Sequence, residues 1–299
     1  MMIPRMLVVD TKLYAYKQFY AGQSILGLLD EVKRDYEAFY DKAPTKIVWA
    51  FDKGRSFRNK LYPEYKAQRL ERLKKQSKAD QRKHKQFHTD YLALQDYLQN
   101  FGEVVQLDGY EADDVASVIA ERFHKDWKVV LLSSDSDWVK FQDDGVVWIK
   151  ATKTGRTLYD FPPDLGYPTE LKPKVDALIG VAKENVGGIK RFGIKTFIKL
   201  YEEVGGDFEA LLSMLSEKYD NSKAVEPFNT VQELFEFNYE LFRRVRYDEL
   251  TDDAKSVVDK LGEFKIKTTQ ADKILFDEYF STPPAGIFAP PFCEFYRIK

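Results

Sequence analysis

Four short apolar runs in the first half of the chain, rich in β-branched and aromatic residues, have the length of buried strands. They occupy residues 6–9, 46–51, 129–132 and 146–149. Between them lie amphipathic helical patterns at about 24–41, 84–100 and 111–125. Alternation of strands with helices predicts an α/β fold with a mostly parallel central sheet flanked by helices.

From about residue 169 onward the pattern becomes helical only, with glycine-rich turns at 187–188 and 205–206. The proline-rich stretch 160–168 interrupts both periodicities and marks a boundary. We therefore predict an α/β part over 1–165, a helical part over 166–284 and an extended tail over 285–299. The α/β part includes a basic segment at 58–90.

The composition suits a protein that folds in water under reducing conditions. The 299 residues are 44% hydrophobic and 31% charged, with no apolar run long enough to span a membrane and no secretory leader. Cys293 is the only cysteine and has no disulfide partner in the chain. We expect a monomer in the cytoplasm of a bacterial cell or a phage-infected host, without a membrane partner.

Net charge is −2, which excludes a uniformly basic nucleic-acid binder, so the distribution of charge matters. Between residues 66 and 85, Glu71 and Asp80 are the only acids. The nine basic residues there are Lys66, Arg69, Arg72, Lys74, Lys75, Lys78, Arg82, Lys83 and Lys85. Such a run is either a solvated helix face or a phosphate-binding surface.

The start of this basic segment favours the phosphate-binding interpretation. It begins shortly after Asp52, which would place Lys66 and Arg69 beside an acidic site. Tyr65 could stack on an unpaired base. Because apolar spacing within 66–85 is poor, we expect this segment to become ordered only when DNA is present.

Three predicted strands are followed by an acid: Asp10, Asp52 and Asp135. Ligands of open parallel sheets bind at the carboxyl ends of the strands, so these side chains should converge. Asp137 lies two residues after Asp135. A further acidic group, Glu111, Asp113 and Asp114, opens the helix predicted at 111–125.

Each acid taken alone is explained by a turn, an N-cap or the helix dipole. Together, seven converging carboxylates would repel one another, and the loops that carry them contain no compensating lysine or arginine. A divalent cation would supply the missing charge, and an all-oxygen set favours Mg²⁺ or Mn²⁺ over zinc. The three histidines, His84, His88 and His124, have no zinc-site context and are interpreted as surface residues.

Three ordered motifs match a known family. They are Phe51-Asp52 leading to Pro63-Glu64-Tyr65-Lys66-Ala67-Gln68-Arg69, then Glu111-Ala112-Asp113-Asp114, then Ser134-Asp135-Ser136-Asp137-Trp138. In this order and spacing, over roughly residues 5–245, the chain resembles the 5′ nucleases, which include flap endonucleases and 5′→3′ exonucleases. The small phage-type members are the most similar.

The resemblance implies a PIN-like core, a basic helical arch and a helix-hairpin-helix-like element at 178–196 that grips duplex DNA. It implies two Mg²⁺ or Mn²⁺ ions, catalytic roles for Lys66, Arg69 and Asp135, and a possible K⁺ ion at the hairpin. The metal ligands it implies are Asp10, Asp52, Glu111, Asp113, Asp114, Asp135, Asp137 and Glu184. The expected DNA contacts are Arg58, Tyr65, Arg72, Lys74, Lys75, Lys78, Gly188, Arg191, Gly193 and Lys195.

The chain departs from the family pattern within the hairpin element. Val181 stands where an aspartate is usual, and Glu184 replaces a second aspartate. Arg191 replaces the first hairpin glycine, and Thr11 follows Asp10 where glycine is usual. These departures weaken the expected second metal site and leave the first largely intact.

The function that follows from the resemblance is a sequence-independent 5′ nuclease acting on DNA with a free 5′ end, a flap or a nick. An RNA–DNA hybrid is a further substrate class, and replication proteins are candidate partners. Two alternatives stay open: a structure-specific DNA-binding protein with reduced catalysis, and a PIN-like ribonuclease. The ribonuclease gives no reason for the basic arm or the hairpin, so it ranks last.

Overall fold

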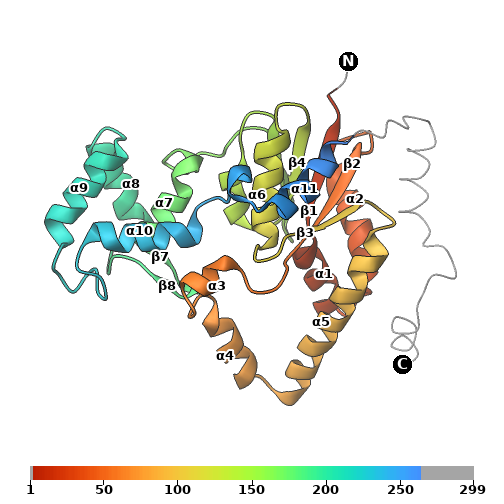
Figure 1. The fold of residues 1–299 in the computed structure, drawn as a ribbon, viewed down its shortest axis with the longest axis horizontal. Coiled ribbons are helices and arrows are strands. Elements are labelled where there is room, and N and C mark those ends of the chain that lie inside the picture. Colours follow the sequence, from red (N-terminus) through yellow and green to blue (C-terminus); the bar gives the residue numbers. More distant parts are fainter. Residues whose placement is uncertain (1–2, 264–299) are drawn as a thin grey trace.

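A six-stranded sheet forms the centre of the molecule in a computed structural model, which describes residues 3–263 (Figure 1). The strand order is β3-β2-β1-β4-β5-β6, and every neighbouring pair is parallel except β5 with β6. The strands are β1 (Arg5–Asp10), β2 (Lys46–Phe51), β3 (Glu103–Gln106), β4 (Lys128–Leu132), β5 (Val146–Ala151) and β6 (Arg156–Tyr159). This architecture confirms the predicted α/β class.

Helices cover both faces of the sheet, which is why its central strands are buried on both sides. One apolar layer joins the sheet to α1 (Thr11–Tyr20), α2 (Leu28–Glu37) and the second half of α5 (Lys78–Leu98). The opposite layer joins it to α6 (Ala112–Phe123) and α11 (Asp252–Asp259). The acids that follow β1, β2 and β4 therefore stand at one edge of a rigid sandwich.

An arch projects from the core, with α4 (Ala67–Lys75) and the first half of α5 as its two sides (Figure 1). The short helix α3 (Phe57–Leu61) leads into it. The Ser77 hydroxyl caps α5 by accepting from the N–H of Asp80 at 3.1 Å, so the turn at the tip is ordered. Both sides of the arch are helical despite the poor apolar spacing. The expectation that this segment orders only when DNA is bound stays a prediction.

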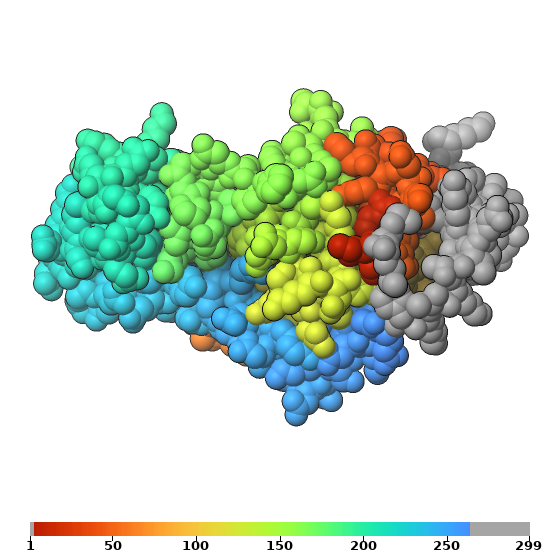
Figure 2. Space-filling model, turned by 90° about the horizontal axis from the view of Figure 1, so that it is seen from above, coloured from red at the N-terminus to blue at the C-terminus, as the bar shows by residue number. Residues whose placement is uncertain are grey.

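The helical lobe contains α7 (Lys172–Ile179), α8 (Ile194–Glu203), α9 (Phe208–Tyr219) and α10 (Val231–Phe242), and it lies beside the core (Figure 2). It has an apolar core of its own around Leu178, Phe197 and Leu211. The chain then returns to the α/β part, where Val245, Val258 and Leu261 pack against the sheet. The expected tail at 285–299 lies outside the described residues.

The lobe also contains a minimal hairpin, β7 (Gly180–Val181) and β8 (Val186–Gly187), where only helices were expected. Short 3₁₀ helices complete the fold at Ile25–Gly27, Ser136–Phe141, Thr169–Leu171, Ala182–Glu184, Tyr247–Glu249 and Lys260–Gly262. Across residues 3–263, none of the helices is both long and apolar enough to cross a bilayer.

Candidate active site

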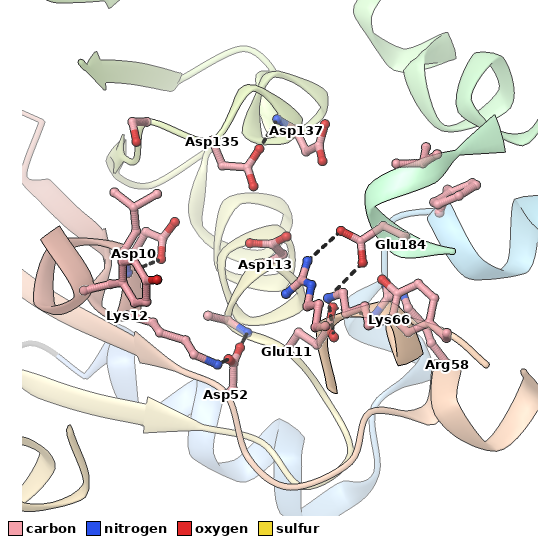
Figure 3. A pocket seen from close by; sticks show the side chains of 18 of the residues that line it. Asp10, Lys12, Asp52, Arg58, Lys66, Glu111, Asp113, Asp135, Asp137 and Glu184 are labelled. Atoms are coloured by element: carbon pink, nitrogen blue, oxygen red, sulfur yellow. Dashed lines mark hydrogen bonds and ion pairs between the residues drawn. The ribbon is translucent and has the colours of Figure 1, made fainter. Parts of the chain in front are cut away.

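The carboxyl ends of β1, β2 and β4 bring Asp10, Asp52 and Asp135 to one cavity of about 690 Å³ (Figure 3). Asp10 is the last residue of β1, and its Oδ1 accepts from the N–H of Leu13 to cap α1. Its Oδ2 accepts from the Ser133 hydroxyl at 2.7 Å, which ties β1 to the end of β4. The predicted convergence of these three acids is therefore what the fold produces.

The N-terminus of α6 supplies two more carboxylates to the same cavity, Glu111 and Asp113. Asp113 accepts from the indole Nε1 of Trp138 at 2.7 Å, which fixes its orientation. The N–H of Ala112 donates to Asp52 at 2.9 Å, so the start of the helix is held against the end of β2. The bond from Trp138 therefore fixes Asp113, and the bond from Ala112 fixes Asp52.

Asp10 and Asp113 are carboxyls whose charge is poorly compensated. Burial raises the pKa of Asp10 to about 6, and the nearby Asp135 and Asp52 add to the effect. Burial likewise raises the pKa of Asp113 to about 7, with Asp10 as the next contributor. Lys140 offsets this effect at Asp113 only in part. Carboxylates held together in this way are what a bound cation would stabilise.

Lysines from distant segments compensate the remaining acids, which corrects the expectation that no cation balances them. The pairs are Lys12 with Asp52, Lys66 with Glu111 and Lys183 with Asp137, each at 2.7 Å. Burial opposes the charge of Asp137, but Lys172 and Lys183 outweigh it and hold its pKa at about 2. The loop after Asp52 does contain Lys53 and Arg55, contrary to the expectation, but Lys53 pairs with Asp108. The lysines that balance the cavity acids come from other segments.

Asp114 turns away from the cavity into a buried ion pair with Arg58. The two guanidinium nitrogens of Arg58 donate to its oxygens at 2.7 and 2.8 Å, and Arg58 Nε donates to the Leu241 carbonyl. Arg58 is 4% exposed and Asp114 is 3% exposed. This placement corrects two expectations, because Arg58 is not free to bind DNA and Asp114 is not oriented to bind a metal.

Tyr65 is also placed differently from its expected role. The ring is 5% exposed and packs in an apolar cluster with Val186, Leu241 and Phe242. Stacking on an unpaired base would require it to leave this cluster. Its outer face instead carries the Lys66 ammonium, 4.9 Å from the ring centroid, so the aromatic ring supports the lysine.

Lys66, at the base of the arch, meets Glu184 of the helical lobe (Figure 3). Arg69 from the same part of the arch also contacts Glu184. Arg69 Nη2 donates to Glu184 Oε1 at 2.9 Å, and Lys66 Nζ lies 3.5 Å from Oε2. The N–H of Lys66 also donates to the Glu184 carbonyl. The cavity is thus closed by residues from the α/β part, the arch and the lobe together.

The other predicted DNA contacts lie on two surfaces outside this cavity. Arg72, Lys74, Lys75 and Lys78 are exposed on the sides of the arch. Gly188, Arg191, Gly193 and Lys195 lie at the start of α8, where Arg191 adopts a left-handed φ of 64°. His84 lines the cavity from α5, although it was interpreted only as a surface residue.

Four further cavity residues were not selected from the sequence: Lys12, Tyr16, Lys140 and Asp176. Lys172 and Lys183, which pair with Asp137, were not selected either. Lys12 and Tyr16 follow Asp10 at helical spacing on α1, which was a readable signal. Lys140 follows Asp137 by three residues in the same 3₁₀ helix, which was a second readable signal. Lys172, Asp176 and Lys183 depend on packing of the lobe against the core. Asp176 lines the same cavity as Val181 and is an acid in that part of the lobe.

The donor set fits a hard divalent cation in chemistry, since every candidate ligand is a carboxylate oxygen. Within residues 3–263, no three acids already close on a common point at ligand distance. Glu184 Oε2 is buried and has no hydrogen-bond partner. Binding an ion would therefore involve small side-chain movements or bridging waters, which Mg²⁺ readily retains.

The acidic cavity lies at the carboxyl edge of a parallel sheet and is bordered by a cationic arch. This combination is typical of proteins that act on phosphate groups. The chain belongs to the 5′→3′ exonuclease family: the model for the 5′-3′ exonuclease N-terminal resolvase-like domain matches residues 5–161. That match includes the arch and every acid of the cavity except Asp176 and Glu184.

Two bacterial relatives illustrate the similarity. A 5′-3′ exonuclease of Buchnera aphidicola subsp. Acyrthosiphon pisum is 28% identical over 218 residues, which cover 65% of this chain and 68% of that protein. DNA polymerase I of Chloroflexus aurantiacus is 27% identical over 237 residues, 73% of this chain. The match covers about a quarter of the polymerase, 24% of its length.

Solved structures of the bacteriophage T5 enzyme share the fold. T5 5′-exonuclease with bound zinc superposes with a TM-score of 0.69 and 22% identity, covering 86% of this chain and 96% of that one. The T5 flap endonuclease in a complex with DNA and metal ions gives 0.63 and 19%, covering 93% and 100%. At these identities the likeness concerns the fold.

Proposed function

We propose that this chain is a structure-dependent, sequence-independent 5′ nuclease that hydrolyses phosphodiester bonds of DNA or RNA–DNA near a free 5′ end. The observation that carries the proposal is the meeting of Asp10, Asp113 and Asp135 with Lys66 in one cavity under the arch. Family membership and the metal-containing T5 neighbours support it. Primer removal and DNA processing are the settings that need this chemistry.

A divalent cation, Mg²⁺ or Mn²⁺, would supply charge stabilisation and an activated water. Asp10, Asp113 and Asp135 would hold it, since they are the least compensated carboxylates of the cavity. Lys66 is placed to neutralise charge on the reacting phosphate, because its ammonium faces the cavity while Tyr65 and Glu111 fix its position. Arg69 would fix the position of Glu184 relative to the base of the arch.

DNA binding would rest on charge without base readout. The exposed cations of the arch offer contacts to a single strand, and the free N–H groups at the start of α8 offer contacts to duplex phosphates. A K⁺ ion at this hairpin is part of the same proposal. No acid in the arch besides Glu71 and Asp80 opposes the phosphates, which favours sequence-independent attraction.

The test is cleavage of 5′-labelled flap, nicked and blunt duplexes in Mg²⁺, with products sized on a gel. The matched control is Asp135→Asn, which keeps the shape of the side chain and removes its charge. Wild type should release short 5′ products, and the variant should bind the same DNA without cutting it. Tight binding with no cleavage by wild type would instead favour the structure-specific DNA-binding protein, with the incomplete acid set at Val181 as its reason.

A further inference from the structure

Both oxygens of Asp137 are occupied by lysine ammonium groups. Lys183 Nζ lies 2.7 Å from Oδ2, and Lys172 Nζ lies 3.3 Å from Oδ1. Lys183 also reaches Asp135 Oδ1 at 3.7 Å, and Lys172 bonds Asp176 at 2.7 Å. Two positive charges therefore lie among Asp135, Asp137 and Asp176, on the side of the cavity nearest the lobe.

These lysines are held in place by the surrounding backbone. Lys172 opens α7, and its bond to Asp176 spans one turn of that helix. Lys183 lies in the 3₁₀ turn between β7 and β8, and that hairpin is tightly packed. A Cβ added at Gly180 would lie 2.3 Å from the backbone nitrogen of Gly188, so the two backbones meet there with no room to shift.

The opposite side of the cavity, where Asp10 and Asp113 lie, differs in its ion pairs. Within the described part of the chain, Asp10 and Asp113 have no ion pair within 4.0 Å, whereas Asp137 has two. Val181 is half-buried against Tyr65 and Val186, in an apolar cluster, and contributes no ligand. The carboxylates available for a metal are thus concentrated on one side.

We propose that the ammonium groups of Lys172 and Lys183 take the place of a second divalent cation, so that the chain binds one catalytic ion. This inference rests on the proposed function, because it concerns the same site. Two ammonium groups carry the charge of one divalent ion, and they approach the same carboxylates that such an ion would need. Lys183 then serves as a resident cation beside Asp135 and Asp137, and no exchangeable ion is needed there.

The experiment counts bound Mn²⁺ by electron paramagnetic resonance on the full chain without DNA. Wild type should bind one Mn²⁺ per chain up to the millimolar range. The variant Lys172→Met/Lys183→Met/Val181→Asp, which removes both ammonium groups and adds a carboxylate, should bind a second Mn²⁺ at least ten times more tightly than wild type does. The control Lys199→Met removes a lysine from the exposed surface of α8 and should leave the count at one.

Two Mn²⁺ ions bound to wild type with similar affinities would overturn the inference, and that measurement needs no variant to fold. An unchanged count in a folded triple variant, checked by circular dichroism, would also overturn it. The count is independent of cleavage. Failure of the nuclease proposal would appear as an inactive wild type that still binds one ion, so the two failures are distinguishable.

Discussion

The ion pair between Asp114 and Arg58 allows a quantitative test of the site assignment. Asp114→Ala would leave the Arg58 guanidinium buried at 4% exposure with its two strongest acceptors removed. Breaking a buried pair by removing one partner costs about 3–5 kcal/mol. Folded domains are stable by about 5–15 kcal/mol, so this single change should remove a large fraction of the total.

The matched control is an ion pair with the same separation between its charged atoms and a much larger exposed fraction. Glu71 and Lys74 also lie 2.7 Å apart, but their side chains are 58% and 71% exposed. Because water screens such a pair, Glu71→Ala should leave the free energy of unfolding almost unchanged. A second control, Arg58→Met/Asp114→Leu, replaces both charges with apolar groups and should recover much of the loss.

The assay is urea unfolding followed by circular dichroism, together with Mn²⁺ affinity measured on the folded variants. Asp114→Ala should shift the urea midpoint strongly while the protein that stays folded binds Mn²⁺ within about threefold of wild type. A loss of stability no larger than that of Glu71→Ala, combined with a large loss of Mn²⁺ affinity, would refute the reasoning. Asp114 would then be a metal ligand, as the family resemblance first implied.

Three further outcomes are expected. Lys66→Ala should lower turnover by about a hundredfold or more with little change in duplex affinity; loss of affinity alone would remove it from the catalytic group. Arg191→Gly should raise stability by up to about 1 kcal/mol, because the left-handed φ of 64° favours glycine, while weakening duplex binding. Since burial raises the pKa of Asp10 to about 6 and of Asp113 to about 7, folded metal-free protein holds these protons more tightly than the unfolded chain. The stability that these two protonated carboxyls contribute is complete below about pH 4 and should be lost as the pH rises through 6–7. The melting temperature of the protein in EDTA should therefore fall over that pH range. The fall should be smaller for Asp113→Asn, and Mg²⁺ should restore the melting temperature.

The central strands could be predicted because they are buried on both faces and so read as continuous apolar runs. Two strands were missed for the opposite reason. β3 carries Glu103 and Gln106 at one edge of the sheet, and β6 begins with exposed residues at the other. Edge strands lack the burial that makes a run apolar, so the sequence carries little signal for them.

The identity of the site acids was partly readable, but their orientation was not. Asp113 and Asp114 are adjacent on α6, where neighbouring side chains point about 100° apart, so only one of them faces the cavity. Which one does so depends on Arg58, which arrives from α3. The lysines that neutralise Asp137 come from 35 and 46 residues further along the chain, so no local pattern predicts them.

The loop at Glu184 and Asn185 makes the site depend on three parts of the molecule at once. The Asn185 side chain donates to the Glu64 carbonyl at 3.0 Å and accepts from Gln68 at 2.6 Å, while the Glu184 carbonyl accepts from the N–H of Lys66. The arch base therefore cannot shift without displacing the loop that carries Glu184 and Lys183. Since the same loop leads through β8 to the start of α8, contacts made by DNA with the lobe and with the arch would both act on the position of Lys66. For the proposed nuclease, such coupling would give a physical reason why an enzyme that reads no bases can still respond to the shape of its substrate.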